Sequence, residues 1–186
     1  AAQDRMTKGN VIGDLAMGLF GDYEEMTVAD ENGKIDLGKM IENTTDAIKR
    51  GVENICEASF SYNGLYCAVD ILRKEKDGYA IYEVKSTTSH MADVATMSKE
   101  LVDKVEKYAK DIAFQKWVLV QCGVKVTGTY LVTLNSDYVR QGDLDVQQLF
   151  NVIDMKELVE NEYSKVPAQQ RMAHMVLQGN EPQKVI

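Results

Sequence analysis

Cysteine and histidine are scarce in this chain, whose 186 residues include three cysteines and two histidines. The cysteines, Cys56, Cys67 and Cys122, lie within predicted strands or helices and have no C-x-x-C spacing. We therefore expect them to be buried small hydrophobic residues in a reducing cytosol. A zinc site needs three or four nitrogen or sulfur ligands, so His90 and His174 do not indicate one. We expect His90 to be a surface residue and His174 to pack on an amphipathic face.

Long apolar runs, phosphate-binding loops and linkers are also missing. No apolar run reaches the roughly 18 residues of a membrane span, and no charged-then-apolar signal peptide opens the chain. The absence of a G-x-x-x-x-G-K-[ST] loop argues against an ATP-driven motor. With 45% apolar and 27% charged residues and no repeat or Pro/Gly/Ser linker, residues 1–186 are expected to form one cytoplasmic domain without a membrane partner.

Positive charge is in deficit, because 21 Lys and Arg stand against 29 Asp and Glu, which gives a net charge of −8. Phosphate binding is driven by Lys and Arg, so any DNA-binding surface has to be local. Four lysines along one predicted helix offer such a surface, namely Lys99, Lys104, Lys107 and Lys110. A solvated helix face is the alternative interpretation of this series, and we favour it.

The order of the predicted elements is typical of the α/β class. Helices are expected over residues 4–20 and 36–50, strands over 53–62, 65–75 and 79–86, a long helix over 98–122, and a strand over 129–134. Asp36 is expected to cap the second helix, Leu37 and Met40 to begin its apolar stripe, and Gly51 to end it. A strand, a long helix and a second strand make a crossover, so the last two strands are expected to pair in parallel.

Residues 154–186 are expected to form a helical C-terminal extension. Asp154 and Glu157 are typical of a capping box at the start of its first helix. Val166 and Pro167 are expected to interrupt that helix, because the residue before a proline disfavours helical backbone.

Asn63 and Gly64 predict a tight hairpin between the first two strands, since Asn-Gly is the strongest short signal for a two-residue turn. With such a turn, the numbers of facing residues sum to 127. Glu57 then lies opposite Asp70.

The second turn lies within residues 76–78 and has two candidate registers. A loop over its first two residues places Glu83 opposite Asp70, whereas a loop over its last two residues places Lys85 there. In both registers Asp70, Glu83 and Lys85 share one face of the sheet, because cross-strand partners share a face and so do residues i and i+2.

Three carboxylates gathered in this way repel one another, and keeping them ionised within a sheet costs several kcal/mol or forces proton uptake. One lysine cannot neutralise them, whereas Mg²⁺ takes oxygen ligands from one or two carboxylates, from waters and from substrate phosphates. An exposed cross-strand salt bridge is the alternative. Apolar neighbours of Asp70 and Glu83 argue against it, because they indicate strands buried on both faces. These neighbours are Val69, Ile71, Leu72, Ile81, Tyr82 and Val84.

The pattern of Asp70, Glu83 and Lys85 resembles the D…E-x-K signature of the PD-(D/E)XK nuclease superfamily. Glu57 is similar to the acidic residue that RecB-like members carry one strand earlier. Gln115 is similar to the glutamine of their Q-x-x-x-Y motif.

The resemblance covers roughly residues 5–150 and is greatest to bacterial RecB-like nucleases related to the CRISPR-associated exonucleases. Two positions depart from the pattern. Leu119 stands where the motif has its tyrosine, and Gly13 stands where many relatives carry a histidine on the leading helix.

This resemblance implies a restriction-endonuclease-like α-β-β-β-α-β core with a central mixed sheet flanked by helices. It implies a metal-dependent DNA nuclease, in particular an exonuclease, that hydrolyses phosphodiester bonds. Asp70 and Glu83 would bind Mg²⁺ or Mn²⁺, aided by the Val84 carbonyl and Glu57. Lys85 would orient or deprotonate the attacking water and steady the charge that develops on the phosphate, a role that fits an amine whose pKa is lowered beside the metal.

Some relatives hold an iron–sulfur cluster through cysteines near their ends, and this chain has no cysteines at the matching places. The resemblance therefore implies no iron–sulfur cluster within this chain. We expect either a core domain truncated at both ends, with a partner domain or subunit outside this fragment, or a short homologue without a cluster.

Gln115 is a candidate site residue without any reference to a family, because it lies on the apolar stripe of the long helix. The stripe also contains Leu101, Val105, Tyr108, Ile112 and Leu119. An amide that faces the sheet needs partners, or it costs about 1–3 kcal/mol. Backbone groups satisfy it, or it reaches the metal-bound water or Lys85. We favour the second, because this helix has to pack over the hairpin.

Two rival functions remain open. Gly13, Leu119 and the acidic balance also suit a non-catalytic nucleic-acid- or protein-binding module that retains the nuclease fold. A structural subunit, with its motor or cluster domain outside this fragment, is the other alternative.

Overall fold

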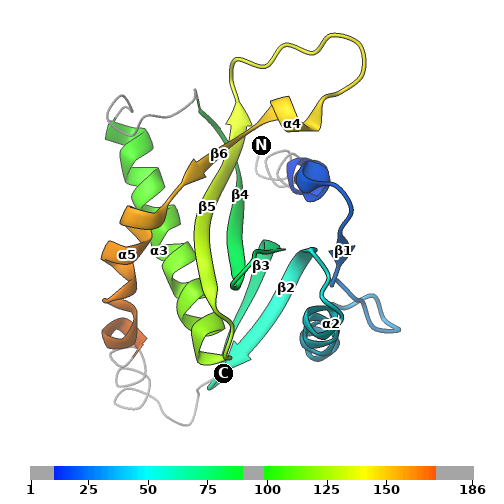
Figure 1. Cartoon of the computed structure of the whole chain (residues 1–186), viewed down its shortest axis with the longest axis vertical. Coiled ribbons are helices and arrows are strands. Elements are labelled where there is room, and N and C mark those ends of the chain that lie inside the picture. Colours follow the sequence, from blue (N-terminus) through cyan, green and yellow to red (C-terminus); the bar gives the residue numbers. More distant parts are fainter. Residues whose placement is uncertain (1–10, 90–98, 171–186) are drawn as a thin grey trace.

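The computed structural model describes residues 11–89 and 99–170, and Figure 1 shows their arrangement. His90, His174, the first part of the expected leading helix and the end of the C-terminal extension lie outside the described residues. In the described ranges, no helix is both long enough and apolar enough to cross a membrane.

A six-stranded mixed sheet forms the centre of the fold, and its strands follow one another in sequence order from β1 to β6. The strands are β1 (Glu24–Glu25), β2 (Asn54–Tyr62), β3 (Leu65–Lys74), β4 (Tyr79–Ser89), β5 (Val126–Asn135) and β6 (Phe150–Asp154). The pairs β1–β2 and β4–β5 are parallel, and the other three neighbouring pairs are antiparallel. An α/β fold with a mixed sheet flanked by helices is thus confirmed.

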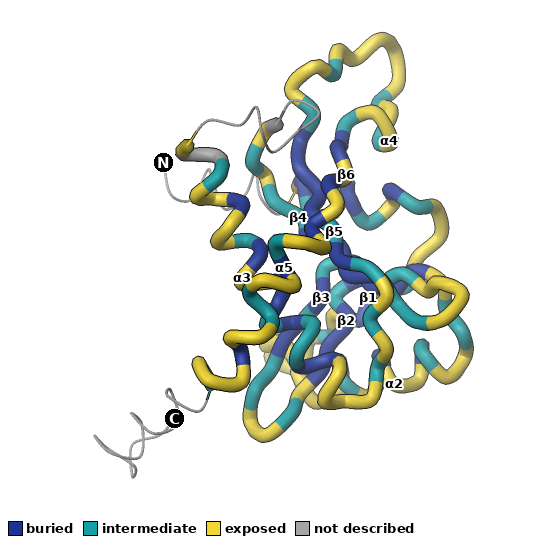
Figure 2. Tube along the Cα trace, turned by 60° about the vertical axis from the view of Figure 1, so that its left-hand side comes forward, coloured by how far each residue is buried: buried dark blue, intermediate teal, exposed yellow. Residues whose placement is uncertain are grey.

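Helices pack on both faces of this sheet (Figure 1). They are a helical segment at residues 11–17 that continues as η1 (Gly18–Phe20), then α2 (Leu37–Arg50), α3 (Lys99–Gln121), α4 (Val146–Leu149) and α5 (Lys156–Tyr163). On one face α3 and α5 contribute Ile112 and Val159 to a core that includes Ile81. On the other face the 11–17 segment contributes Ile12 to a core that includes Tyr82. Figure 2 shows how deeply the central strands β4 and β5 are buried between these layers.

Both predicted hairpins have the expected geometry. Tyr62 pairs with Leu65 across the Asn63–Gly64 turn, in which both residues have positive φ, 47° and 79°. The residue numbers of the paired β2 and β3 residues sum to 127 throughout, as the sequence predicts for a two-residue loop. The β3–β4 pairs, such as Lys74 with Tyr79, sum to 153, so the alternative register that puts Lys85 opposite Asp70 is wrong.

The second helix also forms as predicted. The Asp36 side chain accepts a hydrogen bond from the backbone N–H of Lys39 at 3.0 Å, and Gly51 ends the helix with a left-handed φ of 74°. Met40 is buried, but Leu37 is 46% exposed, so its expected place in the apolar stripe is wrong.

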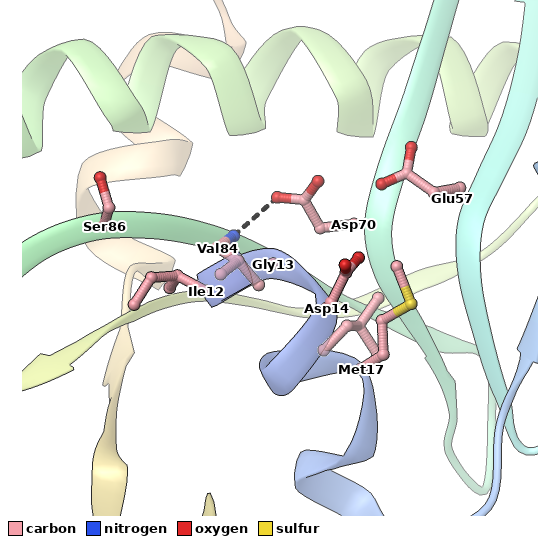
Figure 3. Close-up of a pocket in the computed structure, with 9 residues that line it drawn as sticks. Ile12, Gly13, Asp14, Met17, Glu57, Asp70, Val84 and Ser86 are labelled. Atoms are coloured by element: carbon pink, nitrogen blue, oxygen red, sulfur yellow. Dashed lines mark hydrogen bonds between the residues drawn. The ribbon is translucent and has the colours of Figure 1, made fainter. Parts of the chain in front are cut away.

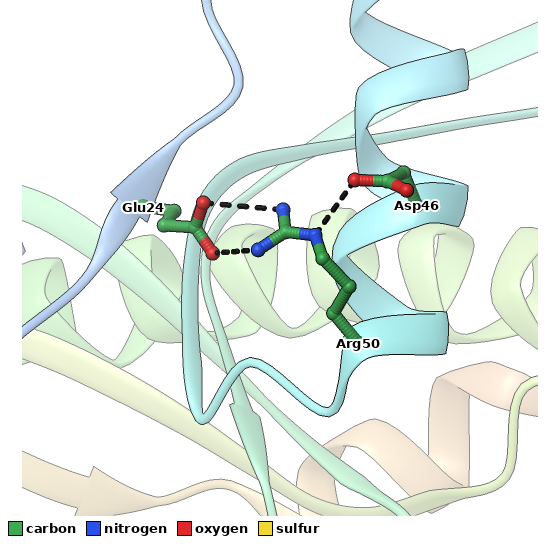
Figure 4. Close-up of polar contacts among 3 residues, drawn as sticks. All are labelled: Glu24, Asp46 and Arg50. Atoms are coloured by element: carbon green, nitrogen blue, oxygen red, sulfur yellow. Dashed lines mark hydrogen bonds and ion pairs between the residues drawn. The ribbon is translucent and has the colours of Figure 1, made fainter.

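Arg50 ties the edge strand β1 to α2 (Figure 4). Its two terminal guanidinium nitrogens donate to the Glu24 carboxylate at 2.9 and 3.1 Å, and its Nε donates to Asp46 at 2.7 Å. The two carboxylates raise the pKa of the guanidinium. All three side chains are exposed, so we assign this cluster a role in geometry more than in stability.

The crossover from β4 through α3 to β5 is parallel, as predicted. The sequence did not reveal β1, α4 or β6. The Asp154 side chain accepts from the Lys156 backbone N–H at 2.9 Å, although Met155 is the N-cap residue of α5. The chain turns at residues 164–165 and is helical again at 166–170, with Pro167 in that first turn, where proline is tolerated.

The cysteines match the prediction in two cases of three. Cys56 and Cys67 are buried, and burial raises the pKa of each thiol to about 12. Cys122 is exposed, so that part of the prediction is wrong. It follows the last turn of α3, in the loop that leads into β5, and its thiol donates to the Ser61 carbonyl at 3.3 Å.

Candidate active site

The candidate site lies where β2, β3 and β4 run side by side. Cys56 pairs with Ile71, and Ala58 pairs with Val69, so Glu57 stands opposite Asp70. On the other side of β3 the register continues from the Ile71–Tyr82 pair and sets Glu83 opposite Asp70. The Asp70 and Glu83 side chains lie within hydrogen-bonding reach of each other.

Glu57 interrupts the regular alternation of β2. Its φ of 55° is left-handed, which is rare for a residue other than glycine and is costly to hold. Ile55 lies in the core beneath α3 and Cys56 in the opposite core, but Ala58 returns to the core beneath α3. The irregular backbone therefore redirects the chain at the residue that carries the carboxylate. Burial, followed by Glu25 and Glu83, raises the pKa of Glu57.

Asp70 is held by a backbone donor from the next strand. The Val84 N–H donates to Asp70 Oδ2 at 2.7 Å, which Figure 3 shows as a dashed line. Burial is the largest cause that raises the pKa of Asp70 well above its ordinary value, and the Glu83 charge is the second. The Val84 N–H opposes this shift in part. Asp70 is thus a carboxyl group for which ionisation is unfavourable unless a cation is near.

Glu83 is buried, with an exposed fraction of 7%, and beside Asp70 it also contacts Gln115 and Lys85. Gln115 Nε2 on α3 donates to its Oε2, and Lys85 Nζ lies 3.4 Å from its Oε1. Gln115 faces the sheet, as predicted, but its amide contacts Glu83 and not backbone or Lys85. Gln115 is itself 8% exposed, and its Oε1 has no hydrogen-bond partner among the described residues.

Lys85 lies between carboxylates from two elements. Its Nζ is 3.8 Å from Asp111 Oδ2 on α3 and 5.1 Å from the centre of the Tyr108 ring. Burial works to lower the pKa of Lys85, but Glu83 and Asp111 outweigh it, so the pKa is raised. The lowered pKa expected for this amine concerns Lys85 beside a metal ion, so it stays a prediction, and in the metal-free protein the pKa is raised. A protonated ammonium orients and stabilises charge, and it is a poor base.

A pocket of about 450 Å³ opens beside these residues, between the strands and the 11–17 segment. Glu57, Asp70 and Val84 line it from the sheet. Figure 3 shows the Asp14 carboxylate, from the 11–17 segment, pointing into the same space as the Glu57 and Asp70 carboxylates. The sequence interpretation singled out Gly13, which also lines the pocket, but missed Asp14.

The residues fit a hard divalent cation that needs only one or two carboxylate ligands from the protein. In the two described ranges, no group of three or more His, Cys, Asp or Glu side chains is arranged to hold a metal ion. Mg²⁺, however, is bound by only one or two carboxylates together with waters and phosphates. The adjacent Asp70 and Glu83 carboxylates supply such a pair, and the unpaired Gln115 Oε1 is a buried acceptor that a metal-bound water would satisfy.

The fold thus brings all the predicted site residues together: Glu57, Asp70, Glu83, Val84, Lys85 and Gln115. No family model matches the chain, and no curated protein matches it either. We therefore infer a function from the residues and the geometry of the site.

Proposed function

We propose that this protein is a metal-dependent deoxyribonuclease, an exonuclease, that hydrolyses phosphodiester bonds. The proximity of the Asp70 carboxylate to the buried Glu83 carboxylate carries the proposal, together with the Lys85 ammonium 3.4 Å from Glu83. Two neighbouring carboxylates are costly to keep ionised in the resting protein, and their arrangement becomes favourable when a cation binds between them.

The order of the elements supports the proposal. The chain runs α2, β2, β3, β4, α3 and β5, with β5 parallel to β4. This order agrees with a restriction-endonuclease-like core, and with the resemblance of the Asp70, Glu83 and Lys85 pattern to PD-(D/E)XK nucleases. We propose that the chain is a member of that superfamily.

Asp70 and Glu83 would hold Mg²⁺ or Mn²⁺, with Glu57 and the Val84 carbonyl as further oxygen donors. A bound cation supplies Lewis-acid polarisation of the phosphate and a more acidic water. Lys85 would orient the attacking water and stabilise the charge that develops on the phosphate. Gln115 holds Glu83 through its amide N–H and offers its free Oε1 as an acceptor for a water proton.

Cleavage of labelled single- and double-stranded DNA, with Mg²⁺, Mn²⁺ or EDTA, tests this proposal. We expect cleavage with either metal and none with EDTA. Asp70→Asn should abolish it, whereas Asp77→Asn, which removes an exposed carboxylate from the β3–β4 turn, should leave it unchanged. Intact DNA under every metal condition would overturn the proposal.

Lys85→Ala separates turnover from metal binding. It removes the ammonium but keeps Asp70 and Glu83, so metal-dependent stabilisation should persist while turnover falls by about 10²–10⁴-fold, the usual contribution of a positioned acid–base group. Gln115→Ala should show a milder loss of the same kind. Cleavage by Lys85→Ala at the wild-type rate would contradict the assigned role.

A second candidate is a binding module that retains this fold without catalysis. It is favoured by the absence, from the described residues, of a three-ligand metal group, and by Leu119, which is fully buried where the RecB motif has its tyrosine. Electrophoretic mobility shifts distinguish the two candidates. A protein that retards labelled DNA but leaves it intact with both metals would be the binding module.

A further inference from the structure

We propose that Asp111 and Tyr108 on α3 are positioning residues that hold the Lys85 ammonium at the site when a cation is bound to Glu83. This inference rests on the proposed function, because it concerns the group that would act on water and phosphate. It adds two residues that belong to no part of the D…E-x-K or Q-x-x-x-Y patterns.

One face of α3 contacts the site strand at three successive points. Gln115 contacts Glu83, Asp111 contacts Lys85, and the Tyr108 and Thr87 hydroxyls are hydrogen-bonded at 2.8 Å. These contacts place residues 83, 85 and 87 of β4 on the face that α3 covers, while residues 108, 111 and 115 step by three and four along the helix. The helix therefore runs antiparallel to the strand and supplies one partner to each site-facing residue.

Three of these groups surround the Lys85 ammonium, whose side chain is 29% exposed. Its Nζ lies 3.4 Å from Glu83 Oε1 and 3.8 Å from Asp111 Oδ2. The Tyr108 ring lies 5.1 Å from Nζ, within the range of a cation–π interaction. The bond from Tyr108 to Thr87 fixes that ring two residues beyond Lys85.

Asp111 gains importance when metal is present. A cation bound to Glu83 takes up part of the negative charge that attracts Lys85, and it repels the ammonium. Asp111 does not line the pocket of about 450 Å³ that Glu57 and Asp70 line, and its side chain is 48% exposed. Its negative charge therefore stays available to Lys85. A half-exposed ion pair contributes little to stability, so its effect should be visible in catalysis rather than in folding.

Steady-state cleavage kinetics with Asp111→Asn test the inference. The variant should lower kcat by roughly 10- to 100-fold with little change in KM, because misplacement of a catalytic group acts on the chemical step. Asp111→Glu should restore most of the loss. Asp103→Asn, which removes an exposed carboxylate two turns earlier on α3, is the matched control and should cleave like wild type.

A double-mutant cycle with Lys85→Ala shows whether Asp111 acts through Lys85. In the Lys85→Ala background, Asp111→Asn should cause no further loss of kcat, because the group that it positions is gone. Losses that multiply would mean that Asp111 acts elsewhere and would overturn the inference. A wild-type rate for Asp111→Asn alone would do the same.

The position of Lys85 can also be read without any cleavage. In the metal-loaded protein, ring currents of Tyr108 should shift the NMR signal of the Lys85 ε-methylene group, which is identified by its loss in Lys85→Ala. Asp111→Asn and Tyr108→Leu should each move this signal towards that of the exposed Lys125. An unmoved signal in Asp111→Asn overturns the inference, whereas an inactive wild-type protein overturns only the proposed function.

Discussion

At the scale of single residues, the energetic cost of the site lies mainly in the unfavourable ionisation of the Asp70 carboxyl group. Burial and Glu83 raise its pKa above the value in the unfolded chain, so the folded protein binds a proton more readily than the unfolded one. Its contribution to the free energy of unfolding is therefore complete at low pH and is lost as the pH rises through the raised pKa. Above that pKa, the ionised group destabilises the metal-free protein.

Asp70→Asn should consequently stabilise the metal-free protein at pH 8, by roughly 1–3 kcal/mol, the usual cost of an uncompensated buried polar group. The amide oxygen still accepts from Val84 N–H, so the bond at 2.7 Å can persist. At pH 4 the gain should shrink, because Asp70 is protonated there. Urea unfolding at the two pH values measures both quantities, with Asp77→Asn as control. A gain that is equal at both pH values would contradict the pKa argument.

A bound metal ion should make the charge of Asp70, which destabilises the metal-free protein, stabilising instead. A ligand that binds only the folded state stabilises it by mass action, by about 2.7 kcal/mol at 100 times its Kd. Millimolar Mn²⁺ should therefore raise the Tm of the wild-type protein, and Asp70→Asn should remove the increment. Thermal unfolding followed by circular dichroism, with and without EDTA, measures it. Equal shifts in the two proteins would place the bound ion elsewhere.

At the scale of the elements, the hairpins were predictable because the position and length of each turn fix which residues face each other across the two strands. Asn63–Gly64 fixes one register and the loop at 76–77 fixes the next, and together they bring Glu57 and Glu83 to Asp70. The sequence could not resolve the choice between 76–77 and 77–78, two loops of equal length whose positions differ by one residue.

What remained hidden depends on contacts between distant segments. β1 is two residues long and exists through its pairing with Ile55 and Cys56. Asp14 joins the pocket because the 11–17 segment packs on the far face of the sheet, which no local pattern encodes. The contact of Asp111 with Lys85 likewise depends on how α3 packs over β4.

The first hairpin turn offers a test at this scale. Gly64 has a φ of 79° with open space around its Cβ position, so Gly64→Ala adds a methyl group without a clash but strains the backbone. The free energy of unfolding should fall by about 1–2 kcal/mol, the cost of a left-handed residue other than glycine. Gly38→Ala in the first turn of α2 should instead raise it by about 0.5–1 kcal/mol. Urea denaturation decides, and the same sign for both variants would contradict the turn geometry.

The whole molecule carries a net charge of −8, which sets how it can meet DNA. Lys107 and Lys110 are exposed on α3, but exposed acidic residues such as Asp103 and Glu106 lie among them. Mixed charges of this kind are typical of a solvated helix face. Under the proposed function, we therefore expect DNA to be held by a cation at the site and by Lys85, and not by the lysines of α3.

Charge reversal on α3 tests that assignment. Lys107→Glu combined with Lys110→Glu should change KM for DNA by less than about twofold, as should the control pair Lys34→Glu and Lys49→Glu, which lies on the α2 side and is also exposed. A surface that contacts phosphate behaves differently, because each neutralised phosphate adds about 0.9 to the slope of log affinity against log salt concentration. This slope is obtained from the DNA affinities of the wild-type protein and of both double variants, measured between about 50 and 200 mM salt. A slope that falls by nearly two in the α3 variant alone would show that α3 holds the DNA. The substrate would then cross the face of the molecule on which Asp111 lies.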